Sequence, residues 1–583
     1  MLAVPTIPET APFSAEQRQW LNGFLAGYFS IPAGAVAPPP ALLAGAVEAR
    51  KPLLLLYGSQ TGTAEQLARK LGKASGQRGC APRVVGMEDY AKVDLTKEET
   101  VLVITSTYGD GEPPDNARAF WQYLKSEPAP TLAHLQFSVL ALGDTNYAGF
   151  CQFGKDCDAR LEELGARRMH PRQDCDVDYA APAGAWQEAV FAALTDRPAP
   201  IAESTASPAV AEGFTRTNPF PARLLENRLL NEPGSAKEVR HFAISLAGSG
   251  LTYEVGDALG VMPANCPERV TELLTLLGCD GEEAVPTADG AETSLRLALA
   301  QHYDVSRPSP DFLKAAAPRF PELAALLDPA RQEELRKFLW GREVIDVLAG
   351  MSTPFGAGEF VTLLKKLQPR LYSISSSPKA HPDEVHLTVG AVRYESHGRR
   401  RKGVASTFLA DRASAETAVP VFVQVSHGFR LPAQGDTPVI MCGPGTGIAP
   451  FRAFLEERAA IGAGGRNWLF FGDQRRATDF LYREQLEGWL AAGHLTRLDL
   501  AFSRDQEARV YVQQRMLEHA AALWAWLQEG AHFYVCGDAS RMAKDVDAAL
   551  HAVCATAGGL SPDAATEYVA RLKSEKRYQR DVY

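Results

Sequence analysis

The sequence predicts an α/β multidomain protein. Its 583 residues are too many for one hydrophobic core, so we expect about three to five domains. Residues 51–195 and 436–583 alternate strand and helix patterns, which is typical of parallel sheets covered by helices. Residues 215–265 and 368–432 contain short strand patterns separated by turns and predict a barrel. Between them, 266–362 has the leucine spacing of an inserted helical subdomain.

The composition disfavours several classes of function. A formal net charge of −10 argues against nucleic acid or an anionic membrane as partner. No apolar run is long enough to span a bilayer, and the N-terminus lacks the basic and apolar regions of a secretory signal. The nine cysteines form no CxxC pair. They therefore predict free thiols in a reducing cytoplasm and no metal site.

Two segments rich in Pro and Ala separate the predicted domains. Residues 1–50 contain an amphipathic stretch at 16–25, with apolar residues at helical spacing, followed by a Pro/Ala-rich tether. Residues 196–214 have the composition of a linker. Because such tethers leave neighbouring domains free to reorient, we expect residues 51–195 to move between a closed and a donating position.

A buried strand pattern at 51–57 runs into a loop of small and hydroxyl residues and then into a helix. Hydroxyls and backbone N–H groups at such a turn bind phosphate, assisted by the helix dipole. The loop lacks the Gly-Lys-Ser/Thr ending of a triphosphate-binding loop, so it suits the monophosphate of FMN. Taken alone, it is equally compatible with an ordinary strand-to-helix turn. The predicted binding residues are Ser59, Gln60, Thr61, Gly62, Thr63 and Ala64.

Two later loops, after the strand patterns 101–105 and 137–142, each contain a tyrosine. Ligands of open parallel sheets lie beyond the carboxyl ends of the strands, so Tyr108 and Tyr147 can sandwich a planar ring. The alternative is that both tyrosines only pack the loops. We expect the backbone amides of Thr107, Gly109 and Gly143 to hold the polar edge of the ring. The three loops together resemble a flavodoxin, and the resemblance adds to the FMN site Ser106, Leu142, Asp144, Phe150 and Cys151.

A second flavin site is predicted from residues 370–376, Arg-Leu-Tyr-Ser-Ile-Ser-Ser. An arginine pairs with phosphate, a tyrosine packs along a ring or ribityl chain, and Ser373 can reach the flavin N5 region. A strand pattern at 385–390 follows, and then a helix start at 403–407 that offers more N–H groups to a pyrophosphate. Arg-x-Tyr-Ser followed by Gly-x-x-Ser resembles the FAD site of the ferredoxin–NADP reductase superfamily. The predicted residues are Arg370, Leu371, Tyr372, Ser373, Thr388, Val389, Gly390, Tyr394, Gly403, Val404, Ala405 and Ser406.

A nicotinamide site is predicted where the strand pattern 438–442 meets a Gly-Pro-Gly-Thr-Gly loop that opens a helix. We expect no acid at the end of the next strand to hold a ribose 2′-hydroxyl. Arg504 and Arg509 can instead pair with a 2′-phosphate, which favours NADPH over NADH, unless they are ordinary surface arginines. Cys536 lies at the end of a later strand. It is expected either near the nicotinamide or, as is commoner for cysteine, as a thiol in the hydrophobic core. The full set is Gly443, Gly445, Thr446, Ser503, Arg504, Arg509, Tyr511, Gln513 and Asp545.

The chain closes with Tyr-Gln-Arg-Asp-Val-Tyr at 578–583. The ring of Tyr583 can stack on a flavin and must leave before nicotinamide approaches, unless the end is a frayed tail. A flavodoxin-like domain at 51–195, a ferredoxin–NADP reductase-like FAD barrel with a helical insert at 215–435, and an NADP-binding α/β domain at 436–583 together resemble the diflavin reductase family. Within it, stretches 143–156, 439–452 and 467–472 and the closing residues are similar to the flavoprotein subunits of bacterial NADPH-dependent sulfite reductases. Tyr108 departs from them, since that position is associated with Gln in those subunits.

The resemblance implies roles and partners. Ser373, Cys536 and Asp581 would support hydride transfer to FAD, and Tyr583 would shield FAD. Electrons would pass from NADPH through FAD and FMN to a separate siroheme/iron–sulfur haem subunit, with residues 1–50 as a possible oligomerisation segment. The alternatives are a reductase for a haem monooxygenase or other one-electron acceptor, and a non-catalytic flavin-binding module. The chain lacks a cysteine cluster for siroheme and iron–sulfur ligation, so it cannot itself reduce sulfite.

Overall fold

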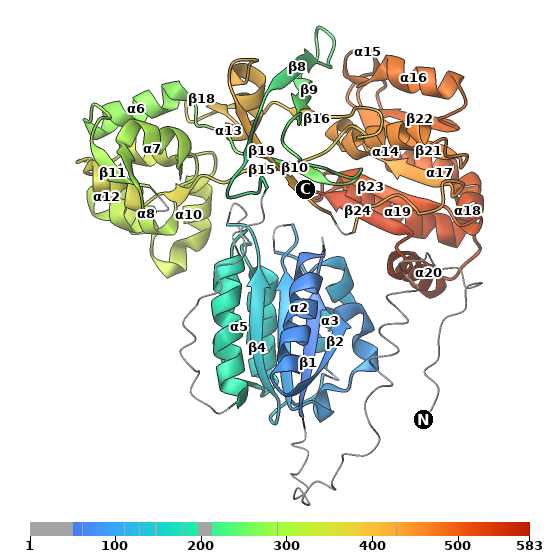
Figure 1. Ribbon diagram of the computed structural model, residues 1–583, viewed down its shortest axis with the longest axis horizontal. Coiled ribbons are helices and arrows are strands. Elements are labelled where there is room, and N and C mark those ends of the chain that lie inside the picture. Colours follow the sequence, from blue (N-terminus) through green and yellow to red (C-terminus); the bar gives the residue numbers. More distant parts are fainter. Residues whose placement is uncertain are drawn as a thin grey trace, which may run out of the picture.

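The computed structural model describes residues 50–195 and 213–583, except 61, 110, 128, 146–148, 178, 288–289 and 427. The predictions for the segment before residue 50 and for most of the linker 196–214 therefore lie outside the described residues. Figure 1 shows one unit in blue and cyan below a barrel, with a helical unit and an orange-red α/β unit on either side of that barrel. The predicted α/β multidomain class is confirmed.

The first unit is a parallel sheet covered by helices on both faces. Its elements are β1 (Lys51–Gly58), α2 (Thr63–Gln77), β2 (Cys80–Gly86), η1 (Met87–Lys92), η2 (Leu95–Lys97), β3 (Thr100–Ser106), η3 (Asp115–Ala117), α3 (Arg118–Lys125), β4 (Gln136–Leu142), α4 (Gln152–Glu163), β5 (Arg167–Arg168), β6 (Gln173–Cys175) and α5 (Ala180–Thr195). The strand order is β2-β1-β3-β4-β5, and β6 also pairs with β4. Along β1, Leu53 and Leu55 pack against α2 and α5, and Leu54 and Leu56 pack on the opposite face. Burial on both faces explains why this strand is a continuous apolar run.

The barrel consists of short antiparallel strands. Its elements are β7 (Phe220–Ala222), β8 (Leu224–Leu229), β9 (Val239–Ser245), β10 (Ala258–Val261), β15 (Arg370–Ser373), β16 (Glu384–Gly390), β17 (Arg393–Ser396), β18 (Arg399–Lys402), α13 (Val404–Thr407), η6 (Phe408–Arg412) and β19 (Val419–Gln424). Two sheets, β15-β10-β19-β7 and β16-β9-β8, enclose one core, and a bridge between Ile374 and Leu387 connects them. This arrangement brings β15 next to β16, although ten residues separate the two strands in the chain.

Helices fill the segment between β10 and β15. The elements are α6 (Pro267–Leu277), β11 (Ala284–Pro286), β12 (Glu292–Ser294), α7 (Leu295–Gln301), β13 (Tyr303–Asp304), α8 (Pro310–Ala316), η4 (Ala317–Arg319), α9 (Pro321–Leu326), η5 (Pro329–Arg331), α10 (Gln332–Leu339), α11 (Val344–Ala349), α12 (Ala357–Thr362) and β14 (Lys365–Lys366). The leucine pattern of α6 faces a core shared by these helices. Arg401 of β18 is buried and pairs with Glu343 at 3.1 Å and Asp346 at 2.6 Å, which fastens the β17–β18 hairpin to the start of α11.

The last unit is a second parallel sheet with helices on both faces. Its elements are β20 (Val439–Cys442), η7 (Gly445–Ile448), α14 (Ala449–Ala460), β21 (Asn467–Asp473), α15 (Arg476–Asp479), α16 (Arg483–Ala491), β22 (Arg497–Phe502), α17 (Val512–Glu518), α18 (Ala520–Gln528), β23 (His532–Gly537), α19 (Met542–Thr556), α20 (Pro562–Ser574) and β24 (Tyr578–Val582). The strand order is β22-β21-β20-β23-β24. The chain end is therefore a strand of the sheet, paired so that Cys536 lies beside Asp581. A frayed C-terminal tail is excluded.

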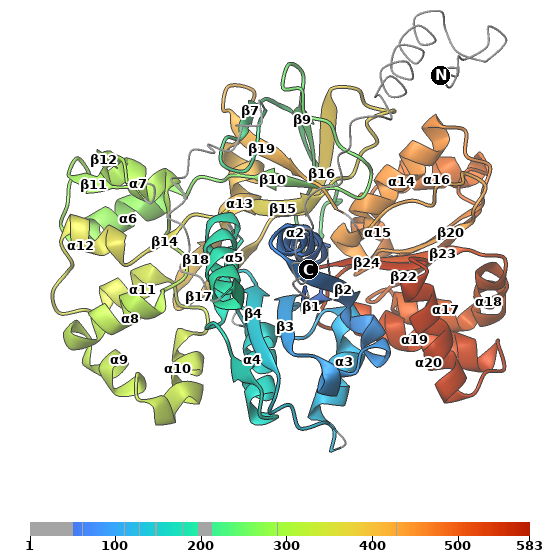
Figure 2. The same cartoon turned by 60° about the horizontal axis from the view of Figure 1, so that its bottom comes forward.

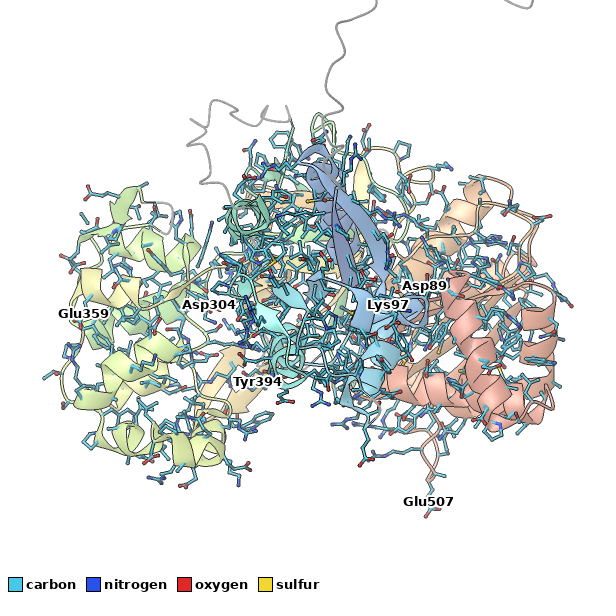
Figure 3. The ribbon with its side chains drawn as sticks, turned by 90° about the horizontal axis from the view of Figure 1, so that it is seen from below. Asp89, Lys97, Asp304, Glu359, Tyr394 and Glu507 are labelled. Atoms are coloured by element: carbon cyan, nitrogen blue, oxygen red, sulfur yellow. The ribbon has the colours of Figure 1, made fainter. Side chains whose placement is uncertain are left out.

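The carboxyl-end loops of the first sheet contact the other units. Arg580 of β24 forms an ion pair with Asp115 in the second loop of the first unit, and Lys544 of α19 pairs with Glu112 at 2.7 Å. Lys365 of β14 donates to the Thr145 carbonyl at 3.3 Å. Figures 2 and 3 show the first unit lying between the helical unit and the α/β unit. The structure is thus a closed arrangement of the domains.

Arg580 and Asp115 form the more buried of the two ion pairs. Their side chains are 4% and 20% exposed, against 52% and 41% for Lys544 and Glu112. Burial works against ionisation of Asp115, but the charges of Arg580, Lys573 and Arg118 hold its pKa below the ordinary value. The closed arrangement is therefore favoured above the ordinary carboxyl pKa, and it weakens as the pH falls through the lowered pKa.

We expect Asp115→Asn to open the molecule. Leaving a buried charge unpaired costs about 3 kcal/mol, or about two orders of magnitude in the docking equilibrium. The radius of gyration from small-angle X-ray scattering at low ionic strength should rise. Glu112→Gln is the matched control, because it removes an exposed pair and should change the radius little. Identical scattering from Asp115→Asn and the unmodified protein would contradict this account.

Candidate functional site

The predicted phosphate loop lies between β1 and the start of α2. Gly62 precedes the helix with φ 91°, and as the N-cap residue it has no side chain to satisfy the helix start. Ser59 Oγ accepts from Gly62 N at 2.9 Å, and Ser59 N donates to Asn116 Oδ1 at 2.8 Å. A hydroxyl-rich turn at the positive end of a fifteen-residue helix fits the phosphate of FMN. Thr61 lies outside the described residues; Gln60, Thr63 and Ala64 are in the same turn.

The second predicted loop is a tight hairpin around Tyr108. Tyr108 and Glu112 exchange backbone hydrogen bonds of 2.9 and 2.8 Å, and Gly109 and Gly111 between them have positive φ. The Tyr108 hydroxyl is buried without a hydrogen-bond partner among the described atoms, and burial raises its pKa to about 12. This loop is joined to the first one, because Gln60 accepts from Asp115 N at 2.9 Å. The Tyr108 hydroxyl could therefore form a hydrogen bond to a polar aromatic ligand bound beside the phosphate loop.

The backbone of these loops corrects one expectation. Thr107 N donates to Leu142 O at 3.0 Å, and Gly143 N donates to Cys175 O at 2.9 Å. Both amides are therefore used within the protein, because the third loop continues the pairing of its strands. The prediction that these two amides hold the flavin edge is wrong in this arrangement. Of the three amides proposed, that of Gly109 stays a prediction.

The third loop follows β4 and surrounds Gly143. A Cβ at Gly143 would lie 2.7 Å from Cys151 N, so only glycine allows this close approach. Cys151 is fully buried and donates to Ala141 O at 3.4 Å, which makes it a support of the loop. Leu142 is buried at the end of β4, Asp144 and Phe150 are half-buried, and Ser106 ends β3 alongside. Tyr147, the second predicted ring contact, lies outside the described residues.

The residues predicted for FAD come together at β15, β16 and the start of α13. Arg370, Tyr372 and Ser373 are half-buried on β15, and Leu371 is exposed. On β16, Val389 packs into the barrel core, and Thr388 Oγ1 lies 2.7 Å from Tyr482 OH, so these two side chains face away from a surface ligand. Tyr394, labelled in Figure 3, is exposed on the β17–β18 hairpin. Only some of the residues predicted to bind FAD therefore have accessible side chains. Gly390 is the last residue of β16.

A cavity adjoins the start of α13. It has a volume of about 180 Å³ and is lined by Val404 and by the cationic side chains of Arg400, Lys402 and Arg412, among others. Arg412 Nε is buried without a partner among the described atoms. Ser406 Oγ holds the turn before the helix by accepting from Val392 N at 3.1 Å, next to Gly403 and Ala405. Glu268, Glu272 and Glu343 also line the cavity, so its four cationic side chains, Arg269 included, exceed the acidic ones by one. This small excess of positive charge at a helix start fits the anionic pyrophosphate of FAD.

Three residues predicted to act in hydride transfer meet, although they are far apart in the chain. Ser373 Oγ donates to Asp581 Oδ2 at 2.6 Å, and Cys536 Sγ lies 3.9 Å from the same oxygen. Removal from water raises the pKa of Asp581, while the hydrogen bonds from Ser373 and Cys536 act in the opposite direction. Burial and then the charge of Asp581 raise the pKa of the Cys536 thiol well above its ordinary value. The cluster is thus a carboxylate that accepts from a hydroxyl and a protonated thiol.

Tyr583 lies beside the glycine-rich loop of the nicotinamide site. Its hydroxyl is 2.8 Å from Thr446 Oγ1, and its backbone N–H donates to Gly537 O at 3.1 Å. The residue as a whole is exposed, and the ring lies at the edge of the site, where it could cover a flat ligand. A Cβ at Gly447 would lie 2.1 Å from Cys536 O, which shows how closely this loop approaches β23. The loop, the terminal ring and the Ser373–Asp581–Cys536 cluster therefore form one site.

The residues predicted to bind a 2′-phosphate gather after β22. Ser503 is half-buried, and Arg504, Arg509 and Tyr511 are exposed on the loop to α17. Figure 3 shows Glu507, in the same loop, projecting away from the domain. Gln513 Nε2 donates to Asp545 Oδ2 at 3.1 Å, which joins this group to α19. Two exposed arginines with nearby hydroxyls fit a dianionic phosphate.

Lys237 lies at the nicotinamide site but was not predicted from the sequence. Lys237, just before β9, pairs at 2.5 Å with buried Asp473, the last residue of β21, and its Nζ would lie 3.9 Å from a Cβ at Gly445. An acid therefore does stand at the end of the strand after β20, contrary to our expectation, but Lys237 neutralises it. The sequence offered only one signal of this ion pair, a basic residue just before a barrel strand. The acid with which it pairs is 236 positions away, so no local pattern connects the two residues. Asp473 Oδ2 would lie 3.7 Å from the same Cβ at Gly445, so an ion pair without net charge borders the loop predicted to bind pyrophosphate.

Comparison with known proteins finds three domain families along the chain. The chain matches the flavodoxin family over residues 55–189, the FAD binding domain over 212–408 and the oxidoreductase NAD-binding domain over 441–548. It is 47% identical to the sulfite reductase [NADPH] flavoprotein alpha-component of Bacillus subtilis, covering 100% of this chain and 96% of that protein. The proteins of the same name from Vibrio cholerae and Neisseria meningitidis are 45% and 44% identical, each over 98% of this chain and over 94% and 95% of their own lengths.

The chain belongs to the family of sulfite reductase [NADPH] flavoprotein alpha-components. It is accordingly an NADPH-dependent oxidoreductase of the diflavin type, with FMN, FAD and NADPH as its cofactors. Among the described residues, no helix is both long and apolar enough to cross a membrane. All nine cysteines are free thiols.

We expect Asp581→Asn to slow flavin reduction by NADPH by about a hundredfold, since an amide offers a weaker and differently arranged acceptor to Ser373 and Cys536. In the unmodified enzyme, this rate should fall as the pH drops through the raised pKa of Asp581, because the protonated carboxyl no longer accepts both hydrogen bonds. Stopped-flow absorbance of flavin-loaded protein measures both effects. If the rate of flavin reduction in Asp581→Asn falls at low pH as it does in the unmodified enzyme, a group other than Asp581 titrates.

Proposed function

We propose that this protein passes electrons from NADPH to the siroheme/iron–sulfur haem subunit of a sulfite reductase, which reduces sulfite to sulfide. The proposal rests on the cluster of Ser373, Asp581 and Cys536 beside the glycine-rich loop, and on full-length relatives that bear the name of this enzyme's flavoprotein component. When bound, the flavins accept a hydride and release its electrons singly.

The residues of the chain supply position and charge. Asp581 orients the Ser373 hydroxyl through a 2.6 Å hydrogen bond, and the buried Cys536 thiol closes the other side of the carboxylate. The start of α14 places positive potential at the loop that would receive the dinucleotide phosphates, and Lys237 offsets the charge of Asp473 beside that loop. Arg504 and Arg509 would pair with the 2′-phosphate and so select NADPH over NADH. Tyr583 would cover the flavin ring until nicotinamide displaces it.

The two tethers and the ion pair between Arg580 and Asp115 support a moving flavodoxin domain. In the closed arrangement its loops face the barrel, and the Gln60 carbonyl would lie 3.6 Å from a Cβ at Gly428. Such contacts cover the surface that must later face an external acceptor. Electron delivery therefore requires the domain to swing out on its linker.

Anaerobic NADPH-driven sulfide production tests the acceptor directly. The flavin-loaded protein is mixed with the purified haem subunit of a sulfite reductase from the same organism. Sulfide that requires both proteins is the expected result, and Asp581→Asn is the negative control.

Loss of sulfide production with intact NADPH–cytochrome c activity would overturn the proposed acceptor. It would leave a diflavin reductase for a haem monooxygenase or another one-electron acceptor. Absence of NADPH oxidation with both flavins bound would instead support a non-catalytic flavin-binding module.

We also propose the compartment in which the protein acts and the segment through which it self-associates. Nine free thiols support a reducing cytoplasm as the place of action. Residues 1–50, which lie almost wholly outside the described residues, are the segment we assign to self-association. Removal of residues 1–49 should leave NADPH–cytochrome c activity intact and reduce the mass measured by light scattering, and an unchanged mass would refute that assignment.

We expect Tyr583→Ala to weaken the preference for NADPH over NADH, since a site without the terminal ring no longer needs the full binding energy of the phosphorylated dinucleotide to open it. The ratio of kcat/KM for the two dinucleotides measures this preference. Tyr583→Phe keeps the ring and loses only the hydrogen bond to Thr446, so it should remain close to the unmodified enzyme. An unchanged ratio in Tyr583→Ala would refute the lid.

A further inference from the structure

A cluster of histidines lies where the barrel meets the nicotinamide-binding domain. His381, Glu384 and His386 each offer one ligand atom, and these atoms lie within 4.8 Å of one another. Glu384 and His386 are on β16, and His381 is in the turn before it. None of the three belongs to the predicted flavin or nicotinamide sites. The cluster therefore needs an explanation of its own.

The pleat of β16 turns these side chains away from the barrel core. Val385, Leu387 and Val389 pack into that core, so Glu384 and His386 point to the opposite face. There, His386 Nε2 is 3.0 Å from Glu384 Oε2, and the rings of His381 and His386 are 4.2 Å apart between centroids. Two imidazoles and a carboxylate converge on one point.

We propose that His381, Glu384 and His386 form a binding site for Zn²⁺ or a similar first-row divalent cation. Two imidazole nitrogens and one carboxylate oxygen are a donor set that Zn²⁺ accepts, with water in the fourth position. The absence of metal sites predicted from the sequence rested on the cysteines, whereas these ligands are histidines and a glutamate. No ion is present at the cluster.

The surroundings of His381 resemble the support of a metal-bound histidine. Its Nε2 lies 3.3 Å from Glu456 Oε1 on α14, and Glu456 is buried. Ligating histidines commonly donate their other ring N–H to a carboxylate, which fixes the ring and raises its basicity. Nδ1 of His381 is then the nitrogen that would bind the ion.

His386 would bind through the nitrogen that faces Glu384. Its Nδ1 lies 3.5 Å from Arg452 Nη1, a long contact, and Arg452 has closer partners in Ser375 O at 2.5 Å and Glu456 at 2.7 Å. Glu456 therefore offsets much of the positive charge of Arg452. The Nε2 side, next to Glu384, is where a cation would be stabilised.

Binding requires a small movement of one side chain. Zn–ligand bonds of about 2.0–2.1 Å place neighbouring tetrahedral ligand atoms about 3.3 Å apart, so no gap between the ligand atoms needs to close by more than about 1.5 Å. The side chain of His381 is 31% exposed and lies in a turn, and that of Glu384 is 38% exposed, so both can rotate. His386 is buried and would stay in place.

The ion would strengthen the seam between two domains. The turn that carries His381 begins at Ser377, whose N–H donates to Glu456 at 3.1 Å and whose hydroxyl donates to Glu457 at 2.5 Å. An ion that fixes this turn to β16 would therefore also fix the hydrogen bonds between Ser377 and α14. Because an ion that binds only the folded state stabilises it, Zn²⁺ should raise the melting temperature.

Isothermal titration calorimetry of the chelator-treated, flavin-loaded full-length protein with ZnCl₂ tests the proposal. The expected result is one saturable site per chain. His381→Ala and Glu384→Gln, which change partly exposed side chains, should each weaken that site at least tenfold and abolish the rise in melting temperature. His551→Ala is the matched control, because His551 also lies by a carboxylate, with its Nε2 3.5 Å from Asp547, but outside the cluster.

Three results would overturn the proposal. They are the lack of a saturable site in the unmodified protein, unchanged Zn²⁺ affinity in His381→Ala, and equal loss of affinity in His551→Ala. Normal flavin absorbance spectra of each variant confirm that it is folded. A second readout is the visible absorption of tetrahedral Co²⁺ at wavelengths beyond the oxidised flavin bands, which should appear in the unmodified protein and be lost in Glu384→Gln.

Discussion

The pairing of the last strand with β23 is the constraint on which the functional site depends. β24 lies at the edge of the sheet, in a register that sets Asp581 beside Cys536. Side chains alternate along a strand, so Asp581 faces Ser373 of the barrel while Arg580 faces Asp115 of the flavodoxin domain. Tyr583 then reaches the loop that contains Thr446. Six residues at the chain end thus contact all three cofactor-binding units.

This arrangement explains why the chemistry is shared between domains. The barrel supplies Ser373, the parallel sheet supplies Cys536 and Asp581, and the barrel also supplies Lys237 to the acid at the end of β21. The Ser373–Asp581–Cys536 cluster is complete only when the barrel and the last unit are in contact, so the relative placement of these two units decides its geometry. Neighbouring residues of one strand contact the barrel and the flavodoxin domain, so the proposed motion of that domain would act on the strand that carries Asp581.

The sequence predicted the α/β multidomain class because the signals of its strands and helices are local. A run of four leucines at 53–56, short and followed by a glycine-containing loop, favours a strand buried on both faces, and the leucines of α6 have helical spacing. The meeting of Ser373 with Asp581 was expected only from family resemblance, since 208 positions separate them. Pairs such as Lys237 with Asp473 and Arg580 with Asp115 depend on how domains dock, which no local pattern encodes. The amides of Thr107 and Gly143 were misjudged because strand pairing continues into their loops.

The most direct test of the central claim compares two shortened chains by the rate of flavin reduction with NADPH. One ends at Val582 and lacks only the terminal ring, and the other ends at Arg577 and lacks all of β24. Flavin absorbance shows that each remains folded and loaded. The account predicts that the chain ending at Val582 still reduces its flavin, whereas the chain ending at Arg577 binds flavin and is not reduced. Reduction of the shorter chain at the rate of the full-length protein would contradict it.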